Sequence, residues 1–359
     1  MTFSKNPSGK LPASAGRIRS VETTGKRRYK DVCAVSRALF LLSVSPVCIA
    51  EPLSAGESFE TLRSVSCEDI ARQTADAFDE ADSDAPRFFQ TAAGTVKGVV
   101  VVAHGLNIKP SKMGAPGAEG TLVALLLDSG YHVVRVTLAG HSGSLERMKT
   151  VSASRWLSDA YVQYSKAYCE ARKAAVPVYL VGFSLGALVF EALMNTETET
   201  PVQFEKAVLF SPALALKNTA RAAFALTPLL KPAAVIPSKS PAPYRAQKGA
   251  SPAAYQALFA LEDQLCAARF AHSNIETLLF IDPDDELISM SALRKRIAEY
   301  GLSRWNTVAV TNSGARSAPR YHHLIIDADC AGEDTWRQIT ARMADFFSSP
   351  AEDAAPRGF

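Results

Sequence analysis

The chain carries a serine in a setting that favours nucleophilic chemistry. The segment from Val178 to Ala187 reads Val-Tyr-Leu-Val-Gly-Phe-Ser-Leu-Gly-Ala, in which Ser184 lies between Gly182 and Gly186. A serine hydroxyl is a weak nucleophile until it is exposed and placed beside a base. The Gly-x-Ser-x-Gly pattern, with an apolar strand before it and an apolar helix after it, predicts a sharp turn that exposes the hydroxyl. We therefore predict that Ser184 is the nucleophile of an acyl-transfer reaction.

Such a serine needs a histidine base, which is expected to follow it in the chain. The histidines after Ser184 are His272, His322 and His323. His272 directly precedes an expected strand, which is a poor place for a base. The two adjacent histidines lie between the last expected strand and the last expected helix, so the base is one of them. Their spacing alone does not decide between His322 and His323.

The acid that orients the histidine is expected in the acidic loop after the strand 277–281. This loop contains Asp282, Asp284 and Asp285. Asp282 and Asp284 flank Pro283, and such positions suit residues that stabilise a turn. The interpretation therefore favours Asp285 as the acid, with Asp284 as the alternative. The resulting order of serine, acid and histidine is the one expected for a serine on a strand-turn-helix motif.

The negative oxygen of an acyl-transfer intermediate needs backbone N–H donors beside the serine. Leu185 directly follows the serine and begins the expected helix, so its N–H is one candidate. The second candidate is Leu106, which follows the apolar run 99–103 and the pair His104-Gly105. We interpret the His104 side chain as a structural group that shapes this loop.

These residues require a sheet that brings several loops together. Apolar segments of strand length alternate with longer amphipathic segments, which predicts a doubly wound, mostly parallel α/β sheet. The expected strands are 98–103, 132–138, 178–181, 206–210, 277–281 and 306–310. The expected helices are 120–128, 154–174, 185–194, 289–300 and 333–347.

Residues from about 213 to 270 interrupt this alternation. They are rich in alanine and proline, contain no clear strand, and carry more basic than acidic side chains. We predict a helical cap inserted over the sheet. Contact of this basic cap with a membrane surface is an alternative role, and so is a solvated decoration.

The first fifty residues have the pattern of an export signal. They carry nine Lys and Arg against Glu22 and Asp31, and an apolar run from Ala38 to Ala50 follows the basic cluster. This pattern predicts a signal peptide, residues 1–50, and an exported protein, periplasmic or secreted. A membrane anchor is the alternative, although the run is shorter than the ~20 apolar residues that span a bilayer. A start codon downstream of Met1 would shorten the long leader.

The rest of the chain restricts the class of partner and the fold boundaries. Beyond residue 50 the formal charge sums to −4, from 30 basic and 34 acidic residues, so we exclude nucleic acid as a partner. Residues 51–89 form an N-terminal segment with an expected helix over 67–80, and 349–359 form a tail. Removal of the leader would leave Cys67, Cys169, Cys266 and Cys330, which could pair in three ways or stay as thiols.

Together these motifs resemble the α/β-hydrolase superfamily, and within it the branch of monoacylglycerol lipases, lysophospholipases and small carboxylesterases. The resemblance covers roughly residues 90–348. The motifs that carry it are His104-Gly105, Leu138–Ser144, Trp156–Asp159, Gly182–Gly186, Asp285–Ile288 and His322. Ser142 departs from the pattern, because it stands where the branch has the second glycine of its Gly-His-Gly-x-Ser loop.

The resemblance implies site residues and an activity. Asp285 is selected because an aliphatic Ile288 follows it after two residues, and His322 because an acidic residue, Asp327, follows five positions later. The implied activity is hydrolysis of small-molecule or lipid esters through an acyl-enzyme, with no metal or organic cofactor and with a cap at about 213–270. A thioesterase, an amidase or peptidase, or an acyltransferase would use the same triad. A non-catalytic binding protein of this fold is a further alternative.

Overall fold

The sheet expected from the apolar segments is present in the computed structural model. The structure describes residue 67 and residues 82–198, 200–225, 231, 234–312 and 321–350. All of them belong to one structural unit that spans Pro52–Phe359. The expected leader, the helix predicted over 67–80 apart from Cys67, and the tail beyond residue 350 lie outside the described residues.

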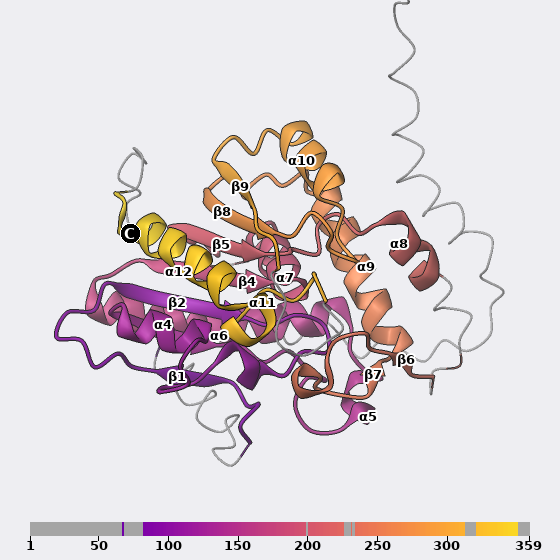
Figure 1. Cartoon of the computed structure of the whole chain (residues 1–359), viewed down its shortest axis with the longest axis horizontal. Coiled ribbons are helices and arrows are strands. Elements are labelled where there is room, and N and C mark those ends of the chain that lie inside the picture. The colour runs from indigo at the N-terminus through magenta and orange to yellow at the C-terminus, as the bar shows by residue number, and fades with distance from the viewer. Residues whose placement is uncertain are drawn as a thin grey trace, which may run out of the picture. The chain divides into compact units, whose positions relative to one another are not determined.

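Within the described residues, seven strands form one sheet in the order β1-β3-β2-β4-β5-β8-β9 (Figure 1). Neighbouring strands are parallel except for β1, which pairs antiparallel with β3. The fold class predicted from the sequence is therefore confirmed. The strands are β1 (Arg87–Phe89), β2 (Gly98–Ala103), β3 (Tyr131–Arg135), β4 (Val178–Phe183), β5 (Lys206–Phe210), β8 (Glu276–Ile281) and β9 (Trp305–Ala309).

Two strands differ from the expectation. β1 was not predicted, and it places residues before 90 in the sheet. β3 ends at Arg135, not at Leu138, and its last side chain is buried. The Arg135 guanidinium donates hydrogen bonds to the carbonyls of Gly114 and Ala85, at 2.8 and 3.2 Å. A charge can stay buried there because backbone carbonyls accept hydrogen bonds from both of its terminal nitrogens.

Helices cover both faces of the sheet (Figure 1). They are α4 (Leu122–Asp128), α5 (Leu145–Met148), α6 (Ala153–Ala174), α7 (Leu185–Met194), α8 (Asn218–Ala225), α9 (Pro252–Ala267), α10 (Met290–Glu299), α11 (Ala328–Ala331) and α12 (Glu333–Ser348), with short 3-10 turns at Pro110–Met113 and Ala242–Tyr244. Serines cap three of the long helices, because Ser152, Ser251 and Ser289 each accept a hydrogen bond from the N–H three residues later.

The continuous apolar strands serve two cores. In β2, Val99 and Val101 pack in a cluster with residues of α6, α7 and α9. The alternate residues, Val100 and Val102, pack in a second cluster with residues of α4 and α12. Because successive strand side chains point to opposite faces, a strand covered on both sides is apolar throughout.

The insertion predicted over 213–270 divides into two parts. Helix α9 packs against α7 and α6, and its Leu258, Leu261 and Leu265 belong to the core cluster of those helices. The residues before α9 contain a short antiparallel pair, β6 (Ile236–Pro237) and β7 (Gly249–Ala250), in a region where we predicted no strand. Part of the insertion is thus a structural helix of the main core.

A disulfide joins Cys67 to Cys169 of α6, across 102 residues of sequence. Cys266 and Cys330 remain as thiols. Of the pairings that the sequence left open, the structure therefore selects one bridge and two thiols. Among the described residues, no helix has the length and apolar character that crossing a membrane requires.

A carboxyl group is buried inside the helix that follows Ser184. Glu191 of α7 is fully buried, and neither of its carboxyl oxygens has a hydrogen-bond partner within the described chain. Burial raises the pKa of Glu191 to about 8, and the nearby Ser273 hydroxyl opposes this shift only in part. The folded protein therefore keeps Glu191 protonated at neutral pH.

This burial predicts a pH-dependent stability. Because the pKa of Glu191 is raised in the folded state, folding disfavours its ionised form, and stability should fall as the pH rises from about 4.5 to about 8. The loss from this one group is up to roughly 5 kcal/mol, at about 1.4 kcal/mol per pKa unit. Urea unfolding at pH 5 and pH 9 should show a smaller pH dependence for Glu191→Gln than for the wild type. Parallel pH profiles of the two proteins would contradict the prediction.

Candidate active site

Ser184 occupies a strained backbone conformation at the junction of β4 and α7. Its φ is 49° and its ψ is −109°, a region that residues with a side chain rarely adopt. The turn needs very close packing on both sides. A Cβ atom on Gly182 would lie 2.8 Å from the Cα of Ala187, and one on Gly186 would lie 2.7 Å from the backbone of Ala103. The two glycines of the Gly-x-Ser-x-Gly pattern are thus required because neither position has room for a Cβ atom.

The hydroxyl of Ser184 is hydrogen-bonded to His323. The Ser184 Oγ lies 2.9 Å from His323 Nε2, and His323 Nδ1 lies 2.8 Å from Asp285 Oδ2. All three side chains are buried. A carboxylate only accepts hydrogen bonds, so the Nδ1 of His323 carries the proton and Nε2 is left to accept from the serine. This is the arrangement of a serine-histidine-aspartate triad.

Asp285 is held as an anion. Its Oδ1 accepts hydrogen bonds from the N–H groups of Leu287 and Ile288, each at 2.8 Å. Burial acts to raise the pKa of Asp285, but the adjacent His323 and these two N–H groups outweigh it, and the pKa lies below its usual value. Asp284, the alternative acid, is exposed, and its N–H donates to the side chain of Asp282. Of the two acids, only Asp285 therefore contacts His323.

The expectation that His322 lies beside Ser184 is wrong. Its Nδ1 lies 2.9 Å from Oδ2 of Asp282, which is buried in the turn before Asp285. This hydrogen bond raises the pKa of His322 above its usual value, and burial opposes the shift. The structure thus contains two parallel histidine-aspartate pairs, and only His323 reaches the serine.

Glu286 holds the backbone of the two histidines in place. Its two carboxylate oxygens accept the backbone N–H groups of His322 and His323, each at 3.0 Å. The Asn312 carboxamide donates to the carbonyls of Tyr321 and Leu324, both at 3.2 Å. These contacts fix the backbone of the loop, so adjacent side chains project to different acids. No sequence pattern had indicated this role for Glu286 or Asn312.

Asp282, Asp284 and His322 also form a group of metal-ligand types. One ligand atom from each lies within 4.8 Å of the others. The Oδ2 of Asp282 is already shared between His322 and the N–H of Asn312, at 2.9 and 2.7 Å. We interpret this group as a hydrogen-bonded support of the histidine loop.

The loop after β2 lies directly against the serine. A Cβ atom on Gly105 would lie 3.2 Å from the Cβ of Ser184. The Gly105 carbonyl accepts from His104 Nδ1 at 2.9 Å and from the Ile108 N–H at 3.2 Å. In a trans peptide the N–H points opposite to the carbonyl, so these bonds set the direction of the Leu106 N–H.

The His104 side chain is a fixed, neutral part of this loop. Its Nε2 accepts the Leu138 N–H at 3.1 Å, which leaves the proton on Nδ1 for the Gly105 carbonyl. Burial holds the pKa of His104 well below its usual range, and the adjacent His141 adds to the shift. This geometry agrees with a structural role for His104.

The two expected oxyanion donors differ in origin. Leu185 is the first residue of α7, where the N–H groups of a helix lack intrahelical acceptors and carry a partial positive charge. Leu106 comes from the loop beside it. Within the described chain, no acceptor takes a hydrogen bond from either N–H. Both N–H groups therefore meet one requirement of an oxyanion donor, which is a hydrogen not already bonded to the protein.

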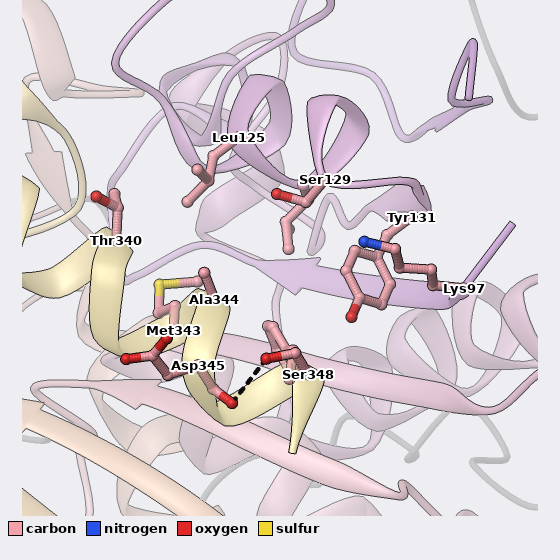
Figure 2. A pocket seen from close by; sticks show the side chains of 11 residues that line it. Lys97, Leu125, Ser129, Tyr131, Thr340, Met343, Ala344, Asp345 and Ser348 are labelled. Carbon is pink, nitrogen blue, oxygen red and sulfur yellow. Dashed lines mark hydrogen bonds between the residues drawn. The ribbon is translucent and has the colours of Figure 1, made fainter. Parts of the chain in front are cut away.

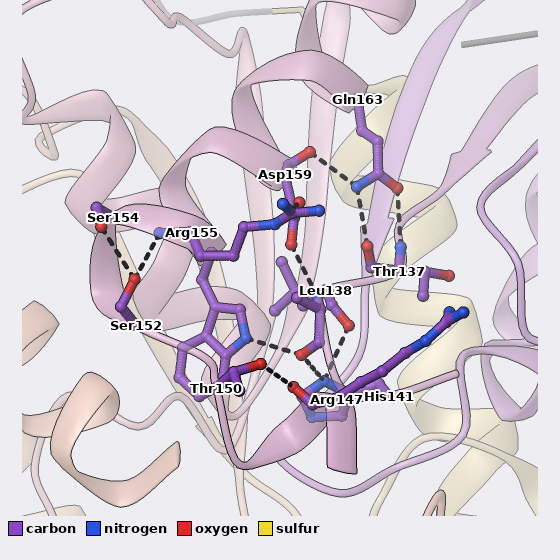
Figure 3. A network of polar contacts seen from close by, with 12 residues as sticks. Thr137, Leu138, His141, Arg147, Thr150, Ser152, Ser154, Arg155, Asp159 and Gln163 are labelled. Atoms are coloured by element: carbon purple, nitrogen blue, oxygen red, sulfur yellow. Dashed lines mark hydrogen bonds and ion pairs between the residues drawn. The ribbon is translucent and has the colours of Figure 1, made fainter. Parts of the chain in front are cut away.

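A polar network holds the loop that follows β3 onto helix α6 (Figure 3). The Asp159 carboxylate accepts the Ala139 N–H at 2.8 Å and pairs with Arg155 at 2.9 Å. The Trp156 indole donates to the Ala139 carbonyl at 3.0 Å, and Gln163 bonds both backbone groups of Thr137. The motif Trp156–Asp159 thus supports a loop and takes no part in the hydrogen bonds of Ser184.

His141 of the same loop is buried beside His104, with ring centroids 4.4 Å apart. Its Nδ1 lies 3.1 Å from the Leu138 carbonyl, and its Nε2 has no partner within the described chain. Burial lowers the pKa of His141 to about 4, so this ring is neutral. Two neutral rings can pack closely where two charged ones would repel.

A separate cavity of about 240 Å³ lies between α4, β3 and α12 (Figure 2). Lys97, Tyr131 and Asp345 are among its polar and aromatic lining residues, and none of the lining residues is Ser184, His323 or Asp285 or lies in their loops. We assign it no part in the chemistry of Ser184.

Comparison with known proteins places this geometry in a family. Residues 94–300, more than half of the chain, match the family model described as serine aminopeptidase, S33 (Hydrolase_4). A search of curated proteins finds no match.

Solved structures share the fold at low sequence identity. A monoglyceride lipase from Saccharomyces cerevisiae has a TM-score of 0.57 at 12% identity, with 74% of this chain and 91% of that chain covered. A structure titled for the metagenome-derived lipolytic enzymes LipS and LipT has a TM-score of 0.56 at 18% identity, covering 74% and 97%. Paleococcus ferrophilus monoacylglycerol lipase has 0.52 at 19%, covering 73% and 98%. With its parallel sheet, strained serine turn and family match, this chain belongs to the serine aminopeptidase S33 family of the α/β-hydrolase superfamily.

Proposed function

We propose that this protein is a serine hydrolase that cleaves carboxylic esters through an acyl-enzyme. The observation that carries the proposal is the hydrogen-bonded chain Ser184–His323–Asp285 at a strained strand-to-helix turn. Strain of this kind persists only where the surrounding packing enforces it, and it clusters at functional sites. A protein that used the fold only for binding would not need this order of hydrogen bonds.

In the proposed reaction, Ser184 Oγ attacks the ester carbonyl while His323 Nε2 removes its proton. The N–H groups of Leu106 and Leu185 stabilise the negative oxygen that forms. His323 then gives the proton to the leaving alcohol, which leaves an acyl group on Ser184. Water, deprotonated by the same histidine, releases the acid. Asp285 stabilises the protonated imidazole in both halves of the reaction.

Variants of the two histidines test this assignment. Ser184→Ala and His323→Ala should each lower kcat for a p-nitrophenyl ester by about 10⁴-fold or more, because each removes a reacting group. His322→Ala should lower kcat less than tenfold, because His322 supports the loop without contacting the serine. The measurement is steady-state hydrolysis, with folding checked by circular dichroism. Equal losses in the two histidine variants would overturn the assignment of His323 as base.

We further propose that the acyl group is a fatty acid. Ser184 is only 7% exposed and His323 only 4%, so a substrate would react in a site largely shielded from water. Apolar chains favour such surroundings. The solved lipases named above support the same class of substrate, because their fold is the fold of this chain.

Chain-length dependence tests the substrate class. We expect kcat/KM for p-nitrophenyl esters to rise from acetate to acyl chains of medium or greater length, since each buried CH₂ contributes about 0.8 kcal/mol. A maximum at acetate would indicate a small-ester esterase. The family description favours amide hydrolysis as the second candidate. Release of p-nitroaniline from aminoacyl p-nitroanilides, with inactive esters, would favour it over ester hydrolysis.

We also propose that the protein is exported. The leader pattern of residues 1–50 is one support, and the disulfide between Cys67 and Cys169 is another, because such bonds persist in oxidising compartments. Expressed with its leader in a bacterial host, the protein should be recovered outside the cytoplasm with an N-terminus near Glu51. Two of the four remaining cysteines should resist thiol reagents in the unfolded, non-reduced protein. Cytoplasmic recovery with four reactive thiols would contradict the proposal.

A further inference from the structure

The loop that carries Leu106 is paired with part of the inserted segment. We name residues 244–248 the cap strap. The Lys109 N–H donates to the Tyr244 carbonyl at 2.8 Å, and Ile108 forms an antiparallel bridge with Arg245. The Ala246 N–H donates to the Asn107 carbonyl at 3.0 Å. The cap strap therefore runs beside the loop as a short extra strand.

Asn107 extends this pairing with its side chain. Its Nδ2 donates to the Gln247 carbonyl at 3.0 Å, and its Oδ1 accepts the Gln247 N–H at 2.8 Å. The carboxamide thus bonds both backbone groups of one residue, as a neighbouring strand would. Asn107 is only 2% exposed, so these hydrogen bonds are shielded from competing water.

The backbone conformation at Asn107 would suit glycine as well as asparagine, so the side chain must be explained by its own contacts. The Ile108 N–H bonds to the Gly105 carbonyl, and Asn107 has a φ of 56°. This is the arrangement of a type II turn, whose third residue needs a positive φ and is usually glycine or asparagine. Glycine would satisfy the turn alone. Asparagine also satisfies the turn, and its side chain in addition bonds to Gln247 of the cap strap.

The cap strap contacts two other loops beside the serine. The Gln247 side chain donates to the Gly143 carbonyl at 2.7 Å. The Tyr244 hydroxyl lies 2.8 and 2.9 Å from the two oxygens of Asp327, four residues after His323. The strap therefore joins the loops that follow β2, β3 and β9, and Asn107 is its side-chain link to the first of them.

We propose that Asn107 is a positioning residue for the oxyanion site. Its carboxamide couples the cap strap to the turn, so that the position of the strap sets the direction of the Leu106 N–H toward the oxygen that becomes negative. The inference rests on the proposed ester hydrolysis. It adds that the inserted segment assembles part of the catalytic site in addition to covering it.

Asn107→Gly isolates this role, because glycine adopts the same positive φ and only the carboxamide is lost. We expect kcat for an ester to fall about ten- to hundredfold, with KM within threefold, since misdirected oxyanion donors weaken transition-state binding. The rate ratio of an ester to its thionoester should fall as well, because sulfur is a poor acceptor for these donors. A kcat within twofold of the wild type, or an unchanged ratio, would overturn the proposal.

A conservative variant and a control sharpen the result. In Asn107→Asp, a protonated carboxyl group can replace both amide bonds, whereas a carboxylate would face the Gln247 carbonyl. Its kcat relative to the wild type should therefore rise as the pH is lowered. Ala175→Gly places glycine at a similar φ of 52° at the end of α6, and it should leave the ester-to-thionoester ratio unchanged. A pH-independent defect in Asn107→Asp would contradict the proposal.

Amide hydrogen exchange separates this inference from the proposed function. In Asn107→Gly, faster exchange should appear at Ile108 and Lys109 and also in the cap strap, because both sides lose the two carboxamide hydrogen bonds that reinforce their backbone pairing. Exchange that changes on one side alone would overturn the coupling. Labelling of Ser184 by a fluorophosphonate in the wild type shows that the proposed function stands. If the wild type shows neither this labelling nor ester turnover, the proposed function is overturned. The positioning role of Asn107 in catalysis is then overturned too, whatever the exchange data show.

Discussion

The backbone of Ser184 turns from β4 into α7 with a positive φ, and the rest of the site is arranged around that turn. An isolated peptide would relax from this conformation, because it costs about 1–3 kcal/mol. The packing of Gly186 against β2 and of Gly182 against α7 allows no such relaxation. The turn also places the first N–H groups of α7 beside the hydroxyl. The Ser184 hydroxyl and the Leu185 N–H are therefore positioned by one local constraint, and they keep their relative positions as long as the sheet and α7 stay packed.

The histidine loop depends on charged hydrogen bonds as well as on packing. Asp282 and Asp285, which follow β8, pair with two consecutive histidines. The carboxylate of Glu286 accepts the backbone N–H groups of both histidines. Charge-assisted hydrogen bonds of this kind are stronger than neutral ones and are geometrically specific. The apolar residues Leu324, Ile325 and Ile326 anchor the loop in the core, and acids after β8 and an amide after β9 fix the two histidines that precede them. The His323 imidazole is thereby kept in one orientation and one tautomer, between Asp285 and Ser184.

The inserted segment has two physical roles. Helix α9 contributes leucines to the core cluster of α6 and α7, so it stabilises the fold. The cap strap contributes hydrogen bonds to the loops at the carboxyl ends of the strands. It therefore lies against the loops that carry Leu106 and His323. Ligand sites of open α/β sheets lie at these strand ends, because loops from several strands converge there. One insertion can serve both roles because its two parts contact different elements: α9 packs on α6 and α7, and the cap strap bonds to the loops.

The sequence by itself determined six of the seven strands of the main sheet, five of the flanking helices and the serine turn, because hydrophobic periodicity and glycine spacing are local signals. Asp285 also followed from the chain, by its place in the acidic loop. The choice of His323 over His322 did not, since adjacent loop residues share the same spacing and differ only in contacts with Asp282, Asp285 and Glu286. The strand β1, the Cys67–Cys169 bridge and the placement of α9 were likewise decided by partners distant in sequence. Such choices depend on which surfaces meet after folding, and no local pattern encodes them.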